Sequence, residues 1–165
     1  MLAQVAAIVV AGVVGVLGLA GCRDDTSAKR LDKREYLRQA RAIEASSAAS
    51  RATRLFFQIV VEPPLPRQPC HARTREFHRL LVTIVDRVER LRAPAEVAGL
   101  QRELVAAART SIRAVKRAAN DVRAANLRCG RPLNLRIYDL PSTRRVNALL
   151  RAYAKRGYVI GLNSD

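Results

Sequence analysis

Aromatic residues are scarce in this chain. Phe, Trp and Tyr make up 4 % of its 165 residues, and Trp is absent. Because single-stranded nucleic acid is held largely by stacking on aromatic rings, this scarcity argues against nucleic acid as a partner. The 49 % apolar fraction is dominated by Ala, Val and Leu. Small aliphatic side chains favour close helix packing, so we expect an all-α fold.

Motifs typical of catalysis are also missing. The chain contains no nucleophile elbow, no glycine-rich phosphate loop and no His-Glu-x-x-His sequence. It has no Cys-x-x-Cys unit either, so a zinc site made of Cys70, His71, His78 and Cys129 is a weak candidate. We therefore expect a protein that is not an enzyme, with no metal and no cofactor.

Acidic residues are few relative to basic ones. The chain has 14 Asp and Glu against 30 Lys and Arg, which gives a formal net charge of +16. Such a charge attracts phosphate-rich partners such as anionic lipid, wall polymer or nucleic acid. An Arg- and Ala-rich, Lys-poor composition is equally typical of a GC-rich genome, in which case the basic residues are solvated helix faces. Both interpretations stay open.

Charge is absent from the first 22 residues, and the run 6–20 contains only Ala, Val, Ile, Leu and Gly. This length fits the apolar region of a secretory signal or a marginal membrane-spanning helix. The run closes on Leu19, Ala20, Gly21 and Cys22.

These four residues resemble the lipobox of bacterial lipoprotein signal peptides, in which an aliphatic residue and two small residues precede an obligatory cysteine. The resemblance implies diacylglycerol transfer to the Cys22 sulfur, cleavage after Gly21 and acylation of the new amino terminus. Two or three acyl chains, such as palmitate, hold a protein durably on a membrane. We therefore expect a lipid-anchored protein on the extracytoplasmic side of the cell membrane.

One feature favours a different topology. No Lys or Arg precedes the apolar run, whereas Arg23, Lys29 and Arg30 follow it. By the positive-inside rule, this arrangement favours an uncleaved anchor with a cytoplasmic domain, which would bind nucleic acid or acidic proteins through its arginines. A start site upstream of Met1, the only methionine, would supply the missing basic residues. The oligomeric state stays open.

The three cysteines leave one pair if Cys22 carries lipid. Outside the cytoplasm, Cys70 and Cys129 can form a disulfide. That bridge would close a loop of about 60 residues and stabilise the fold by about 4 kcal/mol in the chain-entropy model. Two free buried thiols are the other interpretation.

The chain is predicted to consist of a signal peptide at residues 1–21, a lipidated cysteine and polar tether at 22–31, and a helical bundle domain at 32–165. A proline-rich loop at 62–71 interrupts the domain, because proline is excluded from regular helices. Its prolines are Pro63, Pro64, Pro66 and Pro69.

Apolar residues recur at helical spacing in four stretches of the domain. The first predicted helix runs from about Asp32 to the proline-rich loop, and the third runs from Pro94 to Gly130. The fourth is capped by Ser142 or Thr143 and ends at Gly157. The apolar face of the second consists of Phe77, Leu80, Leu81, Ile84, Val85, Val88 and Leu91. We therefore predict a bundle of about four helices, two long and two short, followed by a tail docked through Tyr158 and Ile160.

Basic residues follow the third and fourth predicted helices outside their apolar faces. We expect them to contact the phosphates of lipid head groups or anionic envelope polymers. They are Arg113, Lys116, Arg117, Arg144, Arg145, Arg151, Lys155 and Arg156. Two acidic residues of the third helix, Glu103 and Asp121, are candidates for buried ion pairs.

The order of the segments resembles that of small helical lipoproteins of high-GC bacteria such as actinobacteria. Signal, lipobox and acidic tether are followed by "KREYLRQARAI", "LRAPAEV" and "LRCG". The resemblance implies secretion and a helical fold. It implies no particular activity, so the expected role is envelope-associated binding or structure.

Overall fold

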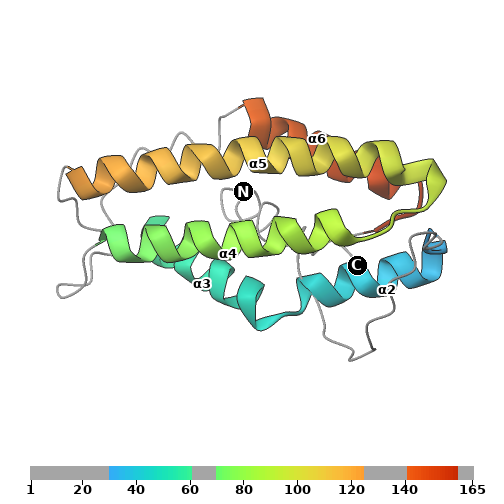
Figure 1. Ribbon diagram of the computed structural model, residues 1–165, viewed down its shortest axis with the longest axis horizontal. Coiled ribbons are helices and arrows are strands. Elements are labelled where there is room, and N and C mark those ends of the chain that lie inside the picture. The colour runs from blue at the N-terminus through green and yellow to red at the C-terminus, as the bar shows by residue number, and fades with distance from the viewer. Residues whose placement is uncertain (1–29, 61–69, 125–140, 160–165) are drawn as a thin grey trace.

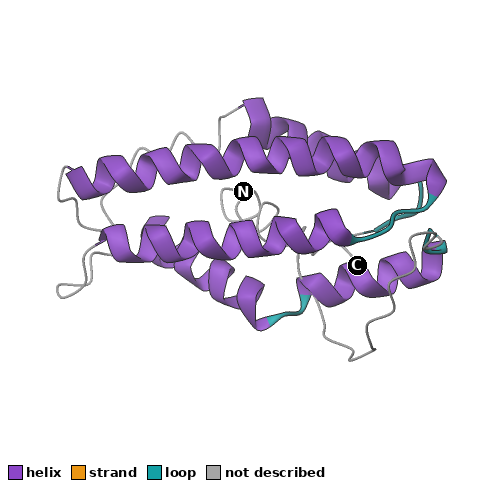
Figure 2. Cartoon of the chain, viewed as in Figure 1, coloured by secondary structure: helices purple, strands orange, loops and turns teal. Residues whose placement is uncertain are grey.

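The computed structural model describes residues 30–60, 70–124 and 141–159. Every regular element in these ranges is a helix (Figures 1 and 2). The elements are α2 (Lys33–Glu44), α3 (Ser47–Val60), α4 (Cys70–Arg90), α5 (Ala95–Ala124) and α6 (Pro141–Lys155). The all-α prediction is confirmed, but the predicted count of four helices is wrong, because the described ranges contain five.

The additional helix arises because the first predicted helix is divided in two. Asp32 caps α2 by accepting a hydrogen bond from the backbone N–H of Glu35 at 2.8 Å. The helix ends at Glu44, because the φ and ψ of the next residue, Ala45, are −83° and 3° and leave the helical range. After the break, the carbonyl oxygen of Ser46 accepts from Ala49 and Ser50 and so starts α3. Figure 1 shows that α2 and α3 meet at an angle.

The two longest helices, α4 and α5, pack against one another as an antiparallel pair joined by a short turn (Figure 1). At 1.5 Å per residue, the 30 residues of α5 span about 45 Å. Helix α4 begins at Cys70, so the last two residues predicted to belong to the proline-rich loop are helical; residues 62–69 lie outside the described residues. The predicted stop of α5 at Gly130 also lies outside them.

Helix α6 crosses the first half of α5 in the antiparallel direction. The hydroxyl of Ser111 on α5 donates to Ser142 at 3.0 Å, and further along Glu103 pairs with Arg145. The helix begins at Pro141, a position that suits proline because its missing N–H would have no helical partner. Ser142 and Thr143 therefore lie inside the first turn, and the prediction that one of them caps the helix is wrong.

The core consists of two apolar clusters along α5. One cluster joins the end of α2, α3, α4 and the middle of α5, with Ile43, Ile84 and Val115 among its buried residues. The other joins α2, the start of α5, α6 and the chain after α6. On the two sides of the break at Ala45, α3 packs on α4, whereas α2 contacts both α4 and, through the stacking of Tyr36 on Tyr153, α6.

Three tyrosines form the centre of the second cluster. The ring of Tyr36 lies parallel to that of Tyr153, with their hydroxyls 3.2 Å apart. Tyr158, only 1 % exposed, packs edge-on against both rings and donates its hydroxyl hydrogen to Glu96. The predicted docking of the tail is confirmed for Tyr158, and Ile160 lies outside the described residues.

The turn into the tail depends on Gly157. Its φ of 73° lies in the left-handed region that glycine adopts without strain, two residues after the last residue of α6. Across the described helices, none combines the length and apolar character that crossing a membrane requires.

Candidate anion-binding groove

The residues predicted to carry the lipid anchor, Leu19, Ala20, Gly21 and Cys22, lie outside the described residues. Cys129 lies outside them as well. Cys70 is fully buried at the start of α4, and its sulfur takes part in a disulfide. The partner is not among the described residues, so the pairing with Cys129 stays a prediction.

All eight predicted anion contacts are exposed on the surface, but the structure divides them between the two halves of α5. Because Ser111 faces the start of α6, Arg113, Lys116 and Arg117 lie beyond that start. The residues from Arg151 to Arg156 lie at the other end, where the chain after α6 reaches Glu96. Seventeen residues of helix separate Glu96 from Arg113, so the two groups of basic residues lie about 25 Å apart along α5.

Several of these residues have interactions within the protein. Arg145 pairs with Glu103, and both side chains are about half exposed. Glu103 is therefore a surface ion-pair partner and not the buried one that the sequence suggests; Asp121 is exposed too. Arg113 donates to the hydroxyl of Thr110 at 2.9 Å.

Lys116 lies close to a histidine of α4. Burial lowers the pKa of His78, and the positive charges of Lys116 and Arg79 lower it further. This environment favours neutral imidazole. Among the described residues, no group of three His, Cys, Asp or Glu side chains is placed to hold a metal ion.

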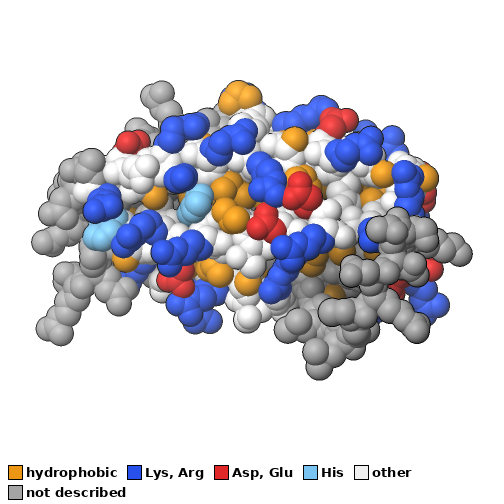
Figure 3. Space-filling model, viewed as in Figure 1, with side chains coloured by type: hydrophobic (Ala, Val, Ile, Leu, Met, Phe, Trp, Pro, Cys, Tyr) orange, Lys and Arg blue, Asp and Glu red, His pale blue; other side chains and the backbone are white. Residues whose placement is uncertain are grey.

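Carboxylates on the described surface are largely engaged by neighbouring groups. Ion pairs link Arg38 to Glu35, Arg51 to Glu76, and Arg109 to both Asp86 and Glu89. Exposed pairs of this kind contribute little to stability. Because they engage most of the described surface carboxylates, few of these carboxylates are left to pair with the remaining arginines. Figure 3 shows Lys and Arg side chains spread over the viewed face with few acidic side chains between them.

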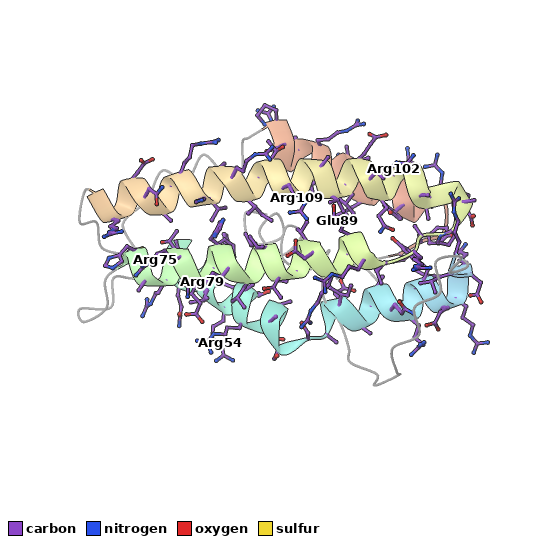
Figure 4. The ribbon with its side chains drawn as sticks, viewed as in Figure 1. Arg54, Arg75, Arg79, Glu89, Arg102 and Arg109 are labelled. Carbon is purple, nitrogen blue, oxygen red and sulfur yellow. The ribbon has the colours of Figure 1, made fainter. Side chains whose placement is uncertain are left out.

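An open groove brings some of these arginines together. It lies between the end of α4, the turn into α5 and one face of α5, and its volume is about 800 Å³. Figure 4 shows Arg109 and Glu89 beside one another between α5 and α4, with Arg102 further along α5 toward its start. The charged and polar residues that line the groove are Arg30, Glu89, Arg92, Gln101, Arg102 and Arg109.

Three of these arginines come from different parts of the chain. Arg30 precedes α2, Arg92 lies in the turn between α4 and α5, and Arg102 is on α5. All three are exposed and have no carboxylate partner among the residues that the structure describes. Arg109, by contrast, is held by Asp86 at 3.0 Å and by Glu89.

Backbone hydrogen bonds fix the walls of the groove. The side-chain amide of Gln101 donates to the carbonyl oxygens of Val88 and Leu91, both at 2.7 Å, and so satisfies the end of α4. The N–H of Leu31 donates to the carbonyl oxygen of Arg92 at 3.0 Å. The segment that contains Arg30 is therefore attached to the turn that contains Arg92.

A second, smaller hollow lies where α5 meets α6. It is lined by Glu103, Thr110, Ser142 and Arg145 among others, with a volume of about 460 Å³. Because Glu103 and Arg145 pair with one another there, this hollow has no excess of positive charge. The groove at the turn between α4 and α5 is the better candidate for an anion.

Sequence reasoning did not single out Arg30, Arg92 or Arg102 as one group. A local signal existed for α5 alone, since Arg102 and Arg109 are seven residues apart and therefore share a helix face. Comparisons with known proteins add no assignment: no family model, no curated protein and no solved structure matches the chain.

Proposed function

We propose that this chain is a lipid-anchored, extracytoplasmic protein that binds anionic lipid or wall polymer through its basic surface and catalyses no reaction. The observation that carries the proposal is the combination of the sequence Leu19-Ala20-Gly21-Cys22 with an excess of exposed arginines. An acylated Cys22 would hold the domain beside the polyanions of the membrane and envelope, where each basic group contributes on the order of 1 kcal/mol near an anionic surface.

The start of the folded domain supports this geometry. Leu31, nine residues after Cys22, is attached by its backbone to the turn between α4 and α5. Nine extended residues span at most about 30 Å. An acylated Cys22 would thus keep the groove within about that distance of the bilayer.

The proposal is tested by locating the domain in cells that express the full chain. We expect the protein in the membrane fraction. In cells whose cytoplasmic membrane is accessible from outside, we expect added protease to digest the domain. The matched variant is Cys22→Ser, which removes only the acylated sulfur. We expect this variant either to be released from the extracytoplasmic membrane surface or to keep its uncleaved signal peptide. Full protection of the unchanged protein from protease would contradict the proposal.

A second function is favoured by the positive charges that follow the apolar run at Arg23 and Lys29. In that topology the domain is cytoplasmic and binds nucleic acid or acidic proteins. Protection from protease, together with DNA binding that weakens steeply with salt, is the result that this alternative predicts.

A further inference from the structure

We propose that the groove between α4, α5 and the turn that joins them is a binding site for the phosphodiester head group of an anionic membrane lipid. The inference deepens the proposed function and rests on it for the source of the ligand. The groove itself consists entirely of described residues.

The groove carries an excess of positive charge, which suits a phosphate group. Arg30, Arg92 and Arg102 approach it from three elements, and none is neutralised by a carboxylate of the described residues. Guanidinium groups bind phosphate oxygens through planar, often bidentate pairs of N–H donors. Arg109 is fixed by Asp86 and Glu89, so it serves as a wall of the groove and not as a mobile ligand.

Apolar side chains line the groove together with the arginines. Leu91, Ala98 and Val105 line the same groove, and its volume of about 800 Å³ is that of a site for a small amphiphilic molecule. A head group with its glycerol backbone presents a phosphate beside carbon-rich atoms. This lining therefore suits a lipid head group better than a bare inorganic ion.

The groove is also held in shape before any ligand arrives. Gln101 is 6 % exposed and joins α5 to the last carbonyls of α4, while Leu31 joins the tether to Arg92. Preorganised walls lower the entropic cost of binding. Since the tether also limits the distance to an acylated Cys22, head groups of the supporting bilayer are the nearest phosphodiesters.

Native mass spectrometry of the full chain in nonionic detergent micelles tests the proposal. The probes are phosphatidylglycerol and phosphatidylcholine, which share a phosphodiester but differ in net charge. We expect the unchanged protein to retain phosphatidylglycerol in preference to phosphatidylcholine. The groove variant, Arg92→Gln with Arg102→Gln, should bind phosphatidylglycerol about 25-fold more weakly, at about fivefold for each arginine.

The matched control removes the same charge elsewhere. Arg54→Gln with Arg75→Gln changes two exposed arginines that lie outside the groove and outside the predicted anion contacts, and it should alter phosphatidylglycerol binding less than twofold. Equal losses in the two double variants would overturn the site, because they would show diffuse attraction to the whole surface. Unchanged melting curves exclude misfolding as the cause of a loss.

A soluble probe separates the two sources of phosphate. If glycerophosphoglycerol, the phosphodiester head group of phosphatidylglycerol without its acyl chains, binds as tightly as phosphatidylglycerol and with the same sensitivity to the groove variant, the ligand is a soluble phosphodiester and the lipid assignment is wrong. Lipid binding in micelles is measured whether or not Cys22 is acylated. An unmodified Cys22 would therefore contradict the proposed function, whereas loss of lipid retention would contradict the groove as a binding site.

Discussion

Replacing Tyr158 with alanine removes the residue that attaches the chain after α6 to the rest of the domain. Its ring is 1 % exposed and packs edge-on against Tyr36 and Tyr153, with ring centroids 5.8 and 6.2 Å away. Truncating a buried aromatic side chain costs about 3 to 5 kcal/mol, which includes the aromatic contacts and the cavity left behind. Because the free energy of unfolding of a domain is about 5 to 15 kcal/mol, this loss is a large share of the total stability.

For a domain of this size we expect the midpoint of thermal unfolding to fall by about 12 °C or more. The assay is far-ultraviolet circular dichroism of the full chain in mild detergent, heated and also titrated with urea. Tyr158→Phe keeps the ring and loses only the hydroxyl bond to Glu96, so it should be much closer to the unchanged protein. Val159→Ala changes the half-buried neighbour and serves as a control. A loss below about 1 kcal/mol for Tyr158→Ala would refute the tyrosine cluster as a structural centre.

Three further changes test other features of the structure. Gln101→Leu removes two side-chain hydrogen bonds to the end of α4 and should lower the free energy of unfolding by about 1 to 2 kcal/mol in urea titrations; an unchanged value would show that the cap is unimportant. Hydrogen bonds from Arg38 and from Gln39 lower the pKa of Glu35 from 4.5 to about 2. The contribution of the ionised Glu35 to stability should therefore be complete above pH 4.5 and be lost as the pH falls through 2. A carboxyl midpoint near 4.5 in nuclear magnetic resonance titration of the unchanged protein, or the same midpoint in Arg38→Gln as in that protein, would contradict this assignment. Gly157→Ala should destabilise by about 1 kcal/mol, because an L residue is strained at a φ of 73°, whereas the contact of the added Cβ with the Nζ of Lys33 is relieved by movement of that flexible side chain; a melting temperature equal to that of the unchanged protein would count against it.

The sequence predicts helices well here because each apolar face is long and regular. The face on α4 is an example: Phe77, Leu81 and Ile84 are all buried where the pattern places them. The division between α2 and α3 was missed because no proline or glycine marks it. Ala45 and Ser46 allow a helix to continue or to stop, so the break depends on tertiary contacts such as that of Tyr36 with the second cluster.

The basic surface is predictable residue by residue, whereas the groove is not. Exposed positions such as Arg113 and Arg151 follow from helical periodicity, since each lies opposite an apolar face. The groove depends on the hydrogen bond between Leu31 and Arg92, which joins segments about 60 residues apart in the chain. No local pattern specifies a contact over such a separation.

Lipid anchoring is best tested by mass spectrometry of the intact protein and of its N-terminal peptide. The protein is purified from the membrane fraction of cells that express it from its native upstream region. We predict a chain that begins at Cys22, with a diacylglyceryl group on the sulfur and an acylated amino terminus. A chain that retains residues 1–21 and carries an unmodified Cys22 would show that the protein is not lipid-anchored and would favour the cytoplasmic alternative.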